Sequence, residues 1–147
     1  MIAVIQRCSQ GKVTVSDKIV GEISHGLVIL LGVQKNDTEN DAEFLVNKIC
    51  GLRIFNDEND KMNLSIKDVN GSALVISQFT LCGDTKKGRR PSFIKAATPN
   101  DGKRLYEYFM SEIKKGGVPI ESGEFGATMD VELVNNGPVT FVLNSKD

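Results

Sequence analysis

The feature that most constrains the fold is a short apolar run near residue 30. Residues 27–31 read Leu-Val-Ile-Leu-Leu, with no polar residue at alternate positions. A strand with one face in water alternates apolar and polar side chains, whereas a strand covered on both faces does not. We therefore expect residues 27–33 to form a central strand, with other parts of the chain packed on both of its faces.

Other segments with strand character lie on both sides of this run. The first three are separated by Gly11, Asp17 and a turn at residues 24–26, which predicts a compact antiparallel meander in the first third of the chain. The polar residues 56–60 are expected to form a hairpin tip. The complete set of expected strands is residues 2–8, 12–16, 18–23, 27–33, 73–81, 120–124, 129–134 and 139–143.

Two segments have helical periodicity and can cover the sheet. The first follows the capping candidates Thr38 and Asn40 and can end at Gly51. The second can be capped by Thr98, with Pro99 in its first turn. The expected buried stripes are Ala42, Leu45, Val46 and Ile49 in the first helix and Leu105, Phe109 and Ile113 in the second.

Length and charge limit the classes of protein that need to be considered. A chain of 147 residues fits one domain, and its 18 basic and 19 acidic residues give a net charge of −1. A field that attracts nucleic acid over the whole surface is therefore excluded, and any RNA contact must be local. The one dense basic stretch is Lys86-Lys87-Gly88-Arg89-Arg90, which by itself could equally be a solvated charge run.

No segment of the sequence is typical of membrane insertion or export. No apolar run approaches the roughly 20 residues that a membrane span requires. The first seven residues, Met1 to Arg7, lack the basic-then-apolar layout of a signal peptide. We expect a cytoplasmic protein without membrane contact.

The sequence also predicts no metal site and no cofactor. The three cysteines are odd in number and include no Cys-x-x-Cys pair, so we interpret them as buried free thiols: Cys8, Cys50 and Cys82. Residues 57–68 loosely match a calcium loop, but Met62 stands where that loop needs glycine and Lys61 where it needs an oxygen ligand. The calcium interpretation is therefore rejected.

The usual catalytic constellations are missing as well. A single histidine, His25, lies in a predicted turn, which favours a surface residue over a general base. A conventional esterase that uses Ser77 or Thr80 with His25 nevertheless stays open from the residues alone. A binding module without turnover stays open too, since no triad or metal site requires hydrolysis.

Two short motifs carry polar or backbone chemistry at the ends of strand-like runs. In Ser77-Gln78-Phe79-Thr80-Leu81, strand alternation would place Gln78 and Thr80 on one face, with Ser77 and Phe79 on the other. In Asn135-Asn136-Gly137-Pro138-Val139-Thr140, the Gly-Pro bond can be cis at modest cost and the backbone can approach a ligand closely. Each motif alone could be a plain strand edge or a hairpin turn.

Together, in this order and at these positions, the two motifs closely resemble the signature motifs of the D-aminoacyl-tRNA deacylase (D-tyrosyl-tRNA deacylase) family. The resemblance extends to the Met1 to Arg7 opening, the 86–91 loop and the 125–127 turn. It implies a deacylase-like α/β fold of one domain over residues 1–147. In that fold, mostly antiparallel, barrel-like sheets are covered by two main helices, and the protein is a homodimer with its active sites at the subunit interface.

The resemblance further implies hydrolysis of the ester of D-aminoacyl-tRNA, and of glycyl-tRNA mischarged on non-cognate tRNA, without a cofactor. The ribose 2′-hydroxyl would help to activate water, which would explain the missing triad. A rigid wall around Gly137 and Pro138, with a cis bond between them, would enter the partner's site and reject L-amino acids. Glycine, which has no side chain, would pass that wall.

Individual roles follow by resemblance. The Phe79 N–H would line the oxyanion site, Gln78 and Thr80 would shape the pocket, and Ser77 would contribute to substrate binding. Thr80 as a nucleophile is the alternative, and positioning is preferred because no base is visible near its hydroxyl. The tRNA acceptor stem would contact the basic loop, with the side chains Lys86, Lys87, Arg89 and Arg90.

Overall fold

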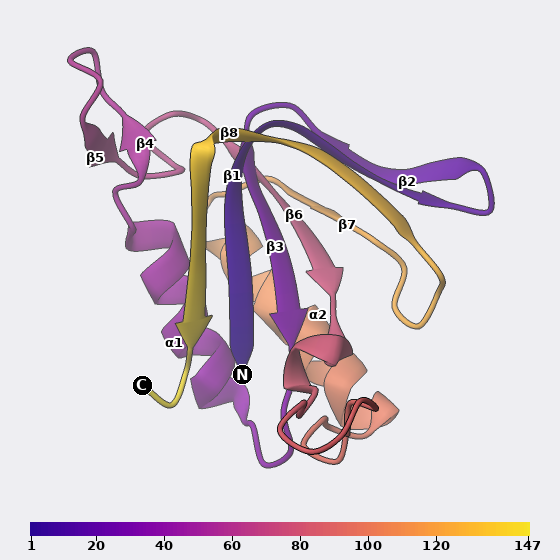
Figure 1. Ribbon diagram of the computed structural model, residues 1–147. Coiled ribbons are helices and arrows are strands. Elements are labelled where there is room, and N and C mark those ends of the chain that lie inside the picture. Colours follow the sequence, from indigo (N-terminus) through magenta and orange to yellow (C-terminus); the bar gives the residue numbers. More distant parts are fainter.

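One six-stranded sheet, curved into an almost closed barrel, organises the chain, which the computed structural model describes over residues 1–147 (Figure 1). Two helices lie against one side of this sheet (Figure 1). The elements are β1 (Ile2–Val15), β2 (Lys18–Ile23), β3 (Gly26–Gly32), α1 (Glu39–Gly51), β4 (Phe55–Asn56), β5 (Met62–Leu64), β6 (Ser72–Ser77), the 3-10 helix η1 (Phe79–Cys82), α2 (Pro99–Lys115), β7 (Ile120–Ser122) and β8 (Asp130–Asn144).

The sheet is antiparallel in its larger part, as predicted. Its order is β2-β1-β3-β6-β7, with β8 on the other edge of β1. Strand β1 is antiparallel to β2, β3 and β8, whereas β6 is parallel to both β3 and β7. The two parallel pairings place the carboxyl ends of β3 and β6 at the same edge, which is where the cavity described below lies.

The expected meander is wrong in its order, because β1 and not β2 lies between the other two strands formed by the first third of the chain. Residues 2–8 and 12–16 join into one strand, whose first half pairs with β3 and whose second half pairs with β2. Gly11 does not interrupt the strand. A Cβ there would lie 2.9 Å from Val28 Cγ2, so glycine allows the bent strand to cross close over the sheet.

Both helices form where the periodicity predicts them. In α2, Thr98 Oγ1 accepts from the N–H of Asp101 at 3.3 Å, Pro99 opens the first turn, and the predicted stripe is buried. In α1 the cap is Thr38, whose N–H donates to Asp41 Oδ2 at 2.8 Å. The other candidate, Asn40, lies inside α1, and Gly51 is its last residue rather than the residue that follows it.

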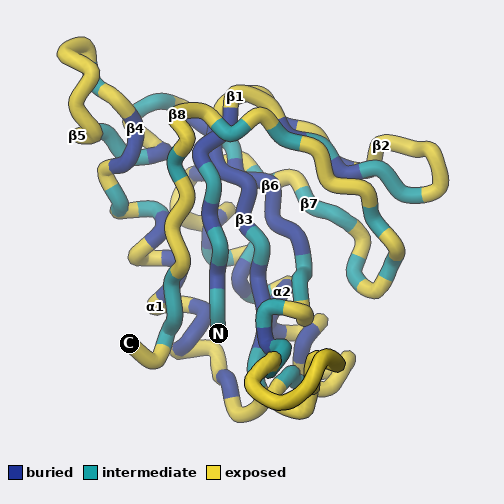
Figure 2. Tube along the Cα trace, in the orientation of Figure 1, coloured by how far each residue is buried: buried dark blue, intermediate teal, exposed yellow.

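The prediction of a strand covered on both faces is confirmed by β3. Leu27 and Ile29 belong to a large core shared with the two helices, while Val28 belongs to a smaller core under the bent half of β1. All three side chains are fully buried. Figure 2 shows β3 and β6 as the most buried strands and β8 as largely exposed.

Two ion pairs, one of them fully buried, tie the ends of the first and last strands to the start of α1. The Met1 ammonium lies 2.9 Å from the Asp37 carboxylate, and both groups are fully buried. Lys146 Nζ lies 2.8 Å from Asp41 Oδ1, and Ser145 Oγ donates to the same oxygen at 2.7 Å. Burial alone would raise the pKa of Asp41, but these bonds outweigh it and hold that pKa well below its usual range.

The remaining local predictions have mixed outcomes. The β4–β5 hairpin carries its tip at the predicted residues, and the Asp57 carboxylate accepts from the N–H groups of Asn59 and Lys61 there. Cys8 and Cys82 are buried free thiols, but Cys50 is only half-buried.

No group of three or more His, Cys, Asp or Glu side chains is arranged to hold a metal ion. None of the helices has the length and apolar character needed to cross a membrane.

Candidate active site

The first motif lies where the sheet ends and the chain turns. Ser77 pairs with Leu31 in the last parallel pair of β3 and β6, and the Gln78 N–H donates to Leu31 O at 2.8 Å. Beyond this point β3 offers no further partner, so the backbone coils into η1. The prediction that residues 73–81 form one strand is therefore wrong beyond Ser77, and so is the alternation of side chains drawn from it.

A cavity of about 490 Å³ opens beside this turn. It lies between the ends of β3 and β6, the start of α2, and the segment that leads into β8. Ser77, Gln78 and Phe79 line it, and most of the lining is apolar. The remaining lining residues are Val33, Ile76, Ala96, Ala97, Thr98, Pro99, Gly102, Phe125, Gly126, Ala127, Met129 and Val131.

The sequence reasoning assigned no site role to most of these residues. Thr98 and Pro99 were recognised only as helix-capping residues, and the 125–127 turn only as part of the family resemblance. A usable signal was present, because ligands in sheets with parallel strands bind beyond the carboxyl ends of those strands. Recognising it would have required the β3–β6 pairing, which strands 46 residues apart in sequence do not reveal (Gly26 pairs with Ser72, and Leu27 with Ala73).

Thr80 stands beside the cavity and is not part of its lining. Its Oγ1 accepts a short hydrogen bond from Gln78 Nε2, so the two side chains lie together for a reason other than strand alternation. The only histidine, His25, is at the other end of β3, where its Nε2 lies 2.7 Å from Val69 O. Six residue steps separate His25 from Leu31, the partner of Ser77, or about 20 Å along a strand. Within the chain, His25 cannot serve Ser77 or Thr80 as a base.

The backbone of η1 presents polar hydrogens at this turn. The N–H groups of Phe79 and Thr80 are the first two of the 3-10 turn, and the opening N–H groups of a helix have no acceptor within it. The turn closes with the Gly83 N–H donating to Thr80 O at 3.0 Å. Two adjacent backbone donors beside an apolar cavity can stabilise an oxygen that gains negative charge.

The second motif lies in the middle of β8 and is not at this cavity. Residues 129–134 and 139–143 were predicted as two strands, but they form one strand that bulges between them. Thr140 pairs with Gln6 and Asn135 pairs with Cys8, so residues 136–139 together face the single residue Arg7. The Gly137-Pro138 bond in this bulge is cis, and Gly137 has a φ of 137°. The Asn135 side chain supports the bulge by accepting from the Val139 N–H at 3.0 Å.

Arg7 holds this bulge from inside the protein and was missed in the sequence. Its guanidinium donates to Asn136 O at 3.0 Å, to Ile54 O at 2.8 Å and to Asn56 Oδ1 at 3.2 Å, and only 7% of the residue is exposed. None of the ion pairs in the structure includes Arg7. A signal did exist, because Arg7 continues the inward-facing series of Ala3 and Ile5 along β1.

The basic loop, residues 86–90, is exposed and lies at the end of the molecule where α2 begins (Figure 1). It extends from a short ladder in which the Asp84 and Ser92 backbones bond to each other at 2.7 and 2.9 Å. The Lys86 N–H donates to the Asp84 carboxylate and, with nearby lysines, lowers the pKa of that group. Phe93, just after the ladder, makes an edge contact with Phe79 of the cavity wall, with ring centroids 5.1 Å apart.

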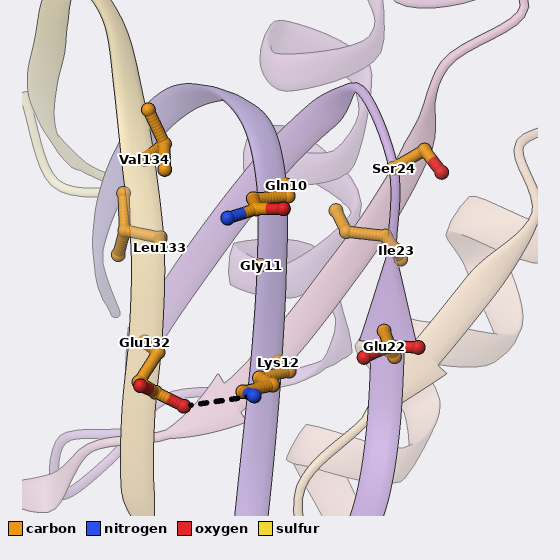
Figure 3. A pocket seen from close by; sticks show the side chains of 9 residues that line it. All are labelled: Gln10, Gly11, Lys12, Glu22, Ile23, Ser24, Glu132, Leu133 and Val134. Atoms are coloured by element: carbon orange, nitrogen blue, oxygen red, sulfur yellow. Dashed lines mark ion pairs between the residues drawn. The ribbon is translucent and has the colours of Figure 1, made fainter.

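A second cleft, of about 440 Å³, lies over the bent half of β1 between β2 and β8 (Figure 3). Its clearest feature is an ion pair across the strands, with Lys12 Nζ 3.3 Å from Glu132 Oε2 (Figure 3). None of the predicted site residues lines this cleft. The cavity beside η1 is therefore the candidate active site.

Comparisons with known proteins agree with the resemblance seen in the sequence. The family model described as D-Tyr-tRNA(Tyr) deacylase matches residues 4–144. Curated proteins named D-aminoacyl-tRNA deacylase from Thermosipho melanesiensis and Thermotoga petrophila are 56% and 55% identical, over 99% of this chain and 98% and 97% of theirs.

Two solved structures share the fold. One, the "c-Myc DNA Unwinding Element Binding Protein", is 37% identical with a TM-score of 0.93, over 98% of both chains. The other, titled as a probable eukaryotic D-amino acid tRNA deacylase, is 18% identical with a TM-score of 0.82, over 97% of this chain and 98% of that one, and shows the fold alone. The match over nearly the whole chain and the identity to curated relatives establish that this chain belongs to the D-Tyr-tRNA(Tyr) deacylase family.

Proposed function

We propose that this chain hydrolyses the ester of D-aminoacyl-tRNA, releasing free D-amino acid and tRNA. The observation that carries the proposal is the cavity beside η1, which has mostly apolar walls and lies next to the backbone N–H groups of Phe79 and Thr80. The relatives named as D-aminoacyl-tRNA deacylases cover the whole chain and therefore include this site. An aminoacyl ester is already activated, so hydrolysis mainly requires a placed water and stabilisation of the oxyanion.

The structure offers no side-chain base for this reaction near η1. The Thr80 hydroxyl accepts from Gln78, and an amide N–H cannot take the proton that a nucleophilic hydroxyl must lose. We therefore assign Thr80 and Gln78 to positioning. The ribose 2′-hydroxyl adjacent to the ester is the group left to assist the water, and the products are the free carboxylate and the restored ribose hydroxyl.

We further infer that the active form is a homodimer. Gly137 and Pro138 lie at the end of the sheet opposite the cavity, so they can reach a cavity only in a second copy of the chain. The exposed strand β8 also carries apolar side chains that a second copy would cover. The most exposed of these are Val131, Val134, Phe141 and Val142, at 36, 47, 37 and 72%.

In such a dimer, the bulge at 136–139 would form one wall of the partner's site. Its backbone carbonyls would bind the ammonium of the substrate and leave no space on the side where an L-amino acid carries its side chain. A D-amino acid presents hydrogen there, and glycine presents hydrogen on both sides. The same wall would therefore accept glycyl-tRNA mischarged on a non-cognate tRNA.

The decisive experiment incubates the purified protein with matched D- and L-aminoacyl-tRNA and follows release of the amino acid. We expect cleavage of the D-ester and of glycyl-tRNA, with the L-ester left intact. Equal cleavage of both enantiomers would contradict the role of the bulge as a chiral wall. Binding of the tRNA without release of amino acid would contradict the hydrolase itself and favour a binding module.

A further inference from the structure

Three large apolar side chains lie exposed together at the rim of the candidate active site. Phe79, Phe93 and Ile94 are 56, 39 and 68% exposed. The two rings meet edge to face, at an interplanar angle of 67°. Side chains of this size are normally buried, so a cluster of them at a cavity mouth marks a binding surface.

We propose that these three residues, the aromatic platform, bind by stacking the unpaired nucleotide that precedes the terminal adenosine of the tRNA. The inference rests on the proposed function, because it presumes that the cavity takes the aminoacylated end of a tRNA. It adds a specific contact for a nucleotide that takes no part in the reaction.

The order of groups along the surface supports this occupant. Phe79 lines the cavity, whereas Phe93 stands beside Phe79 and outside the lining. The basic loop lies further along the same segment, on the other side of the Asp84–Ser92 ladder. The cavity, the platform and the basic loop thus lie in one order along the surface. A tRNA acceptor end has the matching order: the cavity would take the terminal nucleoside, the platform the preceding base, and the basic loop the backbone phosphates.

The chemistry of the platform also fits a single-stranded RNA end. Proteins recognise unpaired nucleotides by stacking bases on aromatic rings while basic side chains contact the phosphates. A protein partner would explain the apolar rings but not the four positive side chains beside them. Charge complementarity therefore favours a polyanion.

The Phe93 ring of the platform is held by packing within the chain. A Cβ at Gly83 would lie 3.0 Å from Phe93 Cε1 and 3.0 Å from Thr80 O, so the Phe93 ring packs directly on the backbone that closes η1. Glycine at position 83 therefore allows the ring to take its place. A ring held in this way loses little conformational freedom when a base stacks on it.

A double-mutant cycle between protein and RNA tests the proposal. The wild type and Phe93→Leu are compared on two chemically aminoacylated acceptor-stem hairpins, one normal and one with an abasic residue before the terminal adenosine. Stacking of one base on an aromatic side chain is typically worth about tenfold or more in affinity. We expect the abasic substrate to lower kcat/KM about tenfold for the wild type and by less than about twofold for Phe93→Leu.

Three controls make the outcomes distinct. Phe93→Tyr keeps a stacking face and is expected to behave as the wild type. Met62→Ala changes a similarly exposed apolar side chain on the β4–β5 hairpin, 54% exposed, and is expected to leave the sensitivity to the abasic residue intact. Sedimentation shows whether Phe93→Leu keeps the oligomeric state of the wild type.

Additive losses from Phe93→Leu and the abasic residue would overturn the platform. A changed oligomeric state in Phe93→Leu would overturn it as well, by assigning the rings to a subunit contact. Failure of the wild type to cleave the normal D-aminoacyl hairpin would instead contradict the proposed function, so the two failures can be told apart.

Discussion

Replacing Arg7 with methionine is the sharpest test of how the bulge that we propose as a chiral wall is held. Methionine keeps an unbranched apolar stem in the same space and removes the guanidinium. Three acceptors then lose a charged donor: Asn136 O, Ile54 O and Asn56 Oδ1. The first acceptor belongs to the bulge of β8, and the other two connect it to the base of the β4–β5 hairpin.

The expected cost follows from these contacts. A hydrogen bond from a charged donor is worth about 1.5–3 kcal/mol, and a buried acceptor left unpaired costs about as much. Against this, Arg7 has no carboxylate partner, so removing it also removes the cost of burying a charge. We expect a net loss of about 2–4 kcal/mol in the free energy of unfolding, which lowers the thermal midpoint by about 5–12 °C in a chain of this size.

The effect on selectivity is expected to exceed the effect on stability. Without Arg7, the Asn136 carbonyl and the neighbouring Gly137 are free to move, and a displacement of about 1 Å in a positioning group can cost about 100-fold. The assay measures kcat/KM for matched D- and L-aminoacyl-tRNA at a temperature where the variant stays folded. Denaturant unfolding gives the stability change in parallel.

Arg7→Lys is the matched control, because lysine keeps the charge but reaches fewer acceptors and cannot reproduce the fork of the guanidinium. We expect it to lie between the wild type and Arg7→Met in selectivity. The reasoning is refuted if Arg7→Met discriminates between D- and L-esters as well as the wild type does. It is also refuted if Arg7→Lys loses discrimination as completely as Arg7→Met.

Four further outcomes are expected. Thr80→Ala is expected to keep most of the single-turnover rate, because Thr80 positions and does not attack; a loss of about 1,000-fold or more in a burst experiment would restore it as the nucleophile. Neutralising the basic loop raises KM and flattens its dependence on salt, and an unchanged slope in a salt titration would return the loop to a solvated charge run. Asp41→Asn costs about 1–3 kcal/mol at neutral pH. The pKa of Asp41 is lower in the folded protein than its usual value. The stabilisation by Asp41 is therefore present above the usual carboxyl pKa and is lost as the pH falls through the folded value. In acid, the free energies of unfolding of the wild type and of Asp41→Asn are expected to converge. Gly137→Ala weakens D-over-L selectivity, since a Cβ there would lie 2.7 Å from Val139 Cγ2 and 3.1 Å from Arg7 Nη2; a crystal structure of the variant with an unmoved bulge would contradict this.

The sequence predicted those features that depend on local periodicity. The non-alternating run at 27–31 identified the central strand, and Thr98 with Pro99 located the start of α2, because burial and capping leave their pattern within a few residues. Features that depend on distant partners were missed or misassigned. Ser77 ends its strand because β3 stops beside it, and nothing in residues 77–81 records where β3 stops.

The site shows the same division. Its lining includes Ser77, Gln78 and Phe79, which the family motif identified, but Thr80 lies outside the lining and Phe125 had no assigned role. Arg7 was missed because a single charged residue on an apolar strand has no local mark of its three acceptors. Those acceptors come from segments about 50 and 130 residues further along the chain (Ile54 is 47 and Asn136 is 129 positions away).

The pairing of β1 with β8 has a consequence for the order in which the protein is made. Ile2 pairs with Asn144, so β1 leaves the ribosome well before β8, the partner with which it pairs. Translation at about 5–20 residues per second leaves that edge of β1 open for several seconds. During this interval it is an unpaired edge, of the kind that joins other chains. The bulge with Gly137 belongs to this later strand, so the proposed chiral wall can form only after β8 has been translated and has paired with β1.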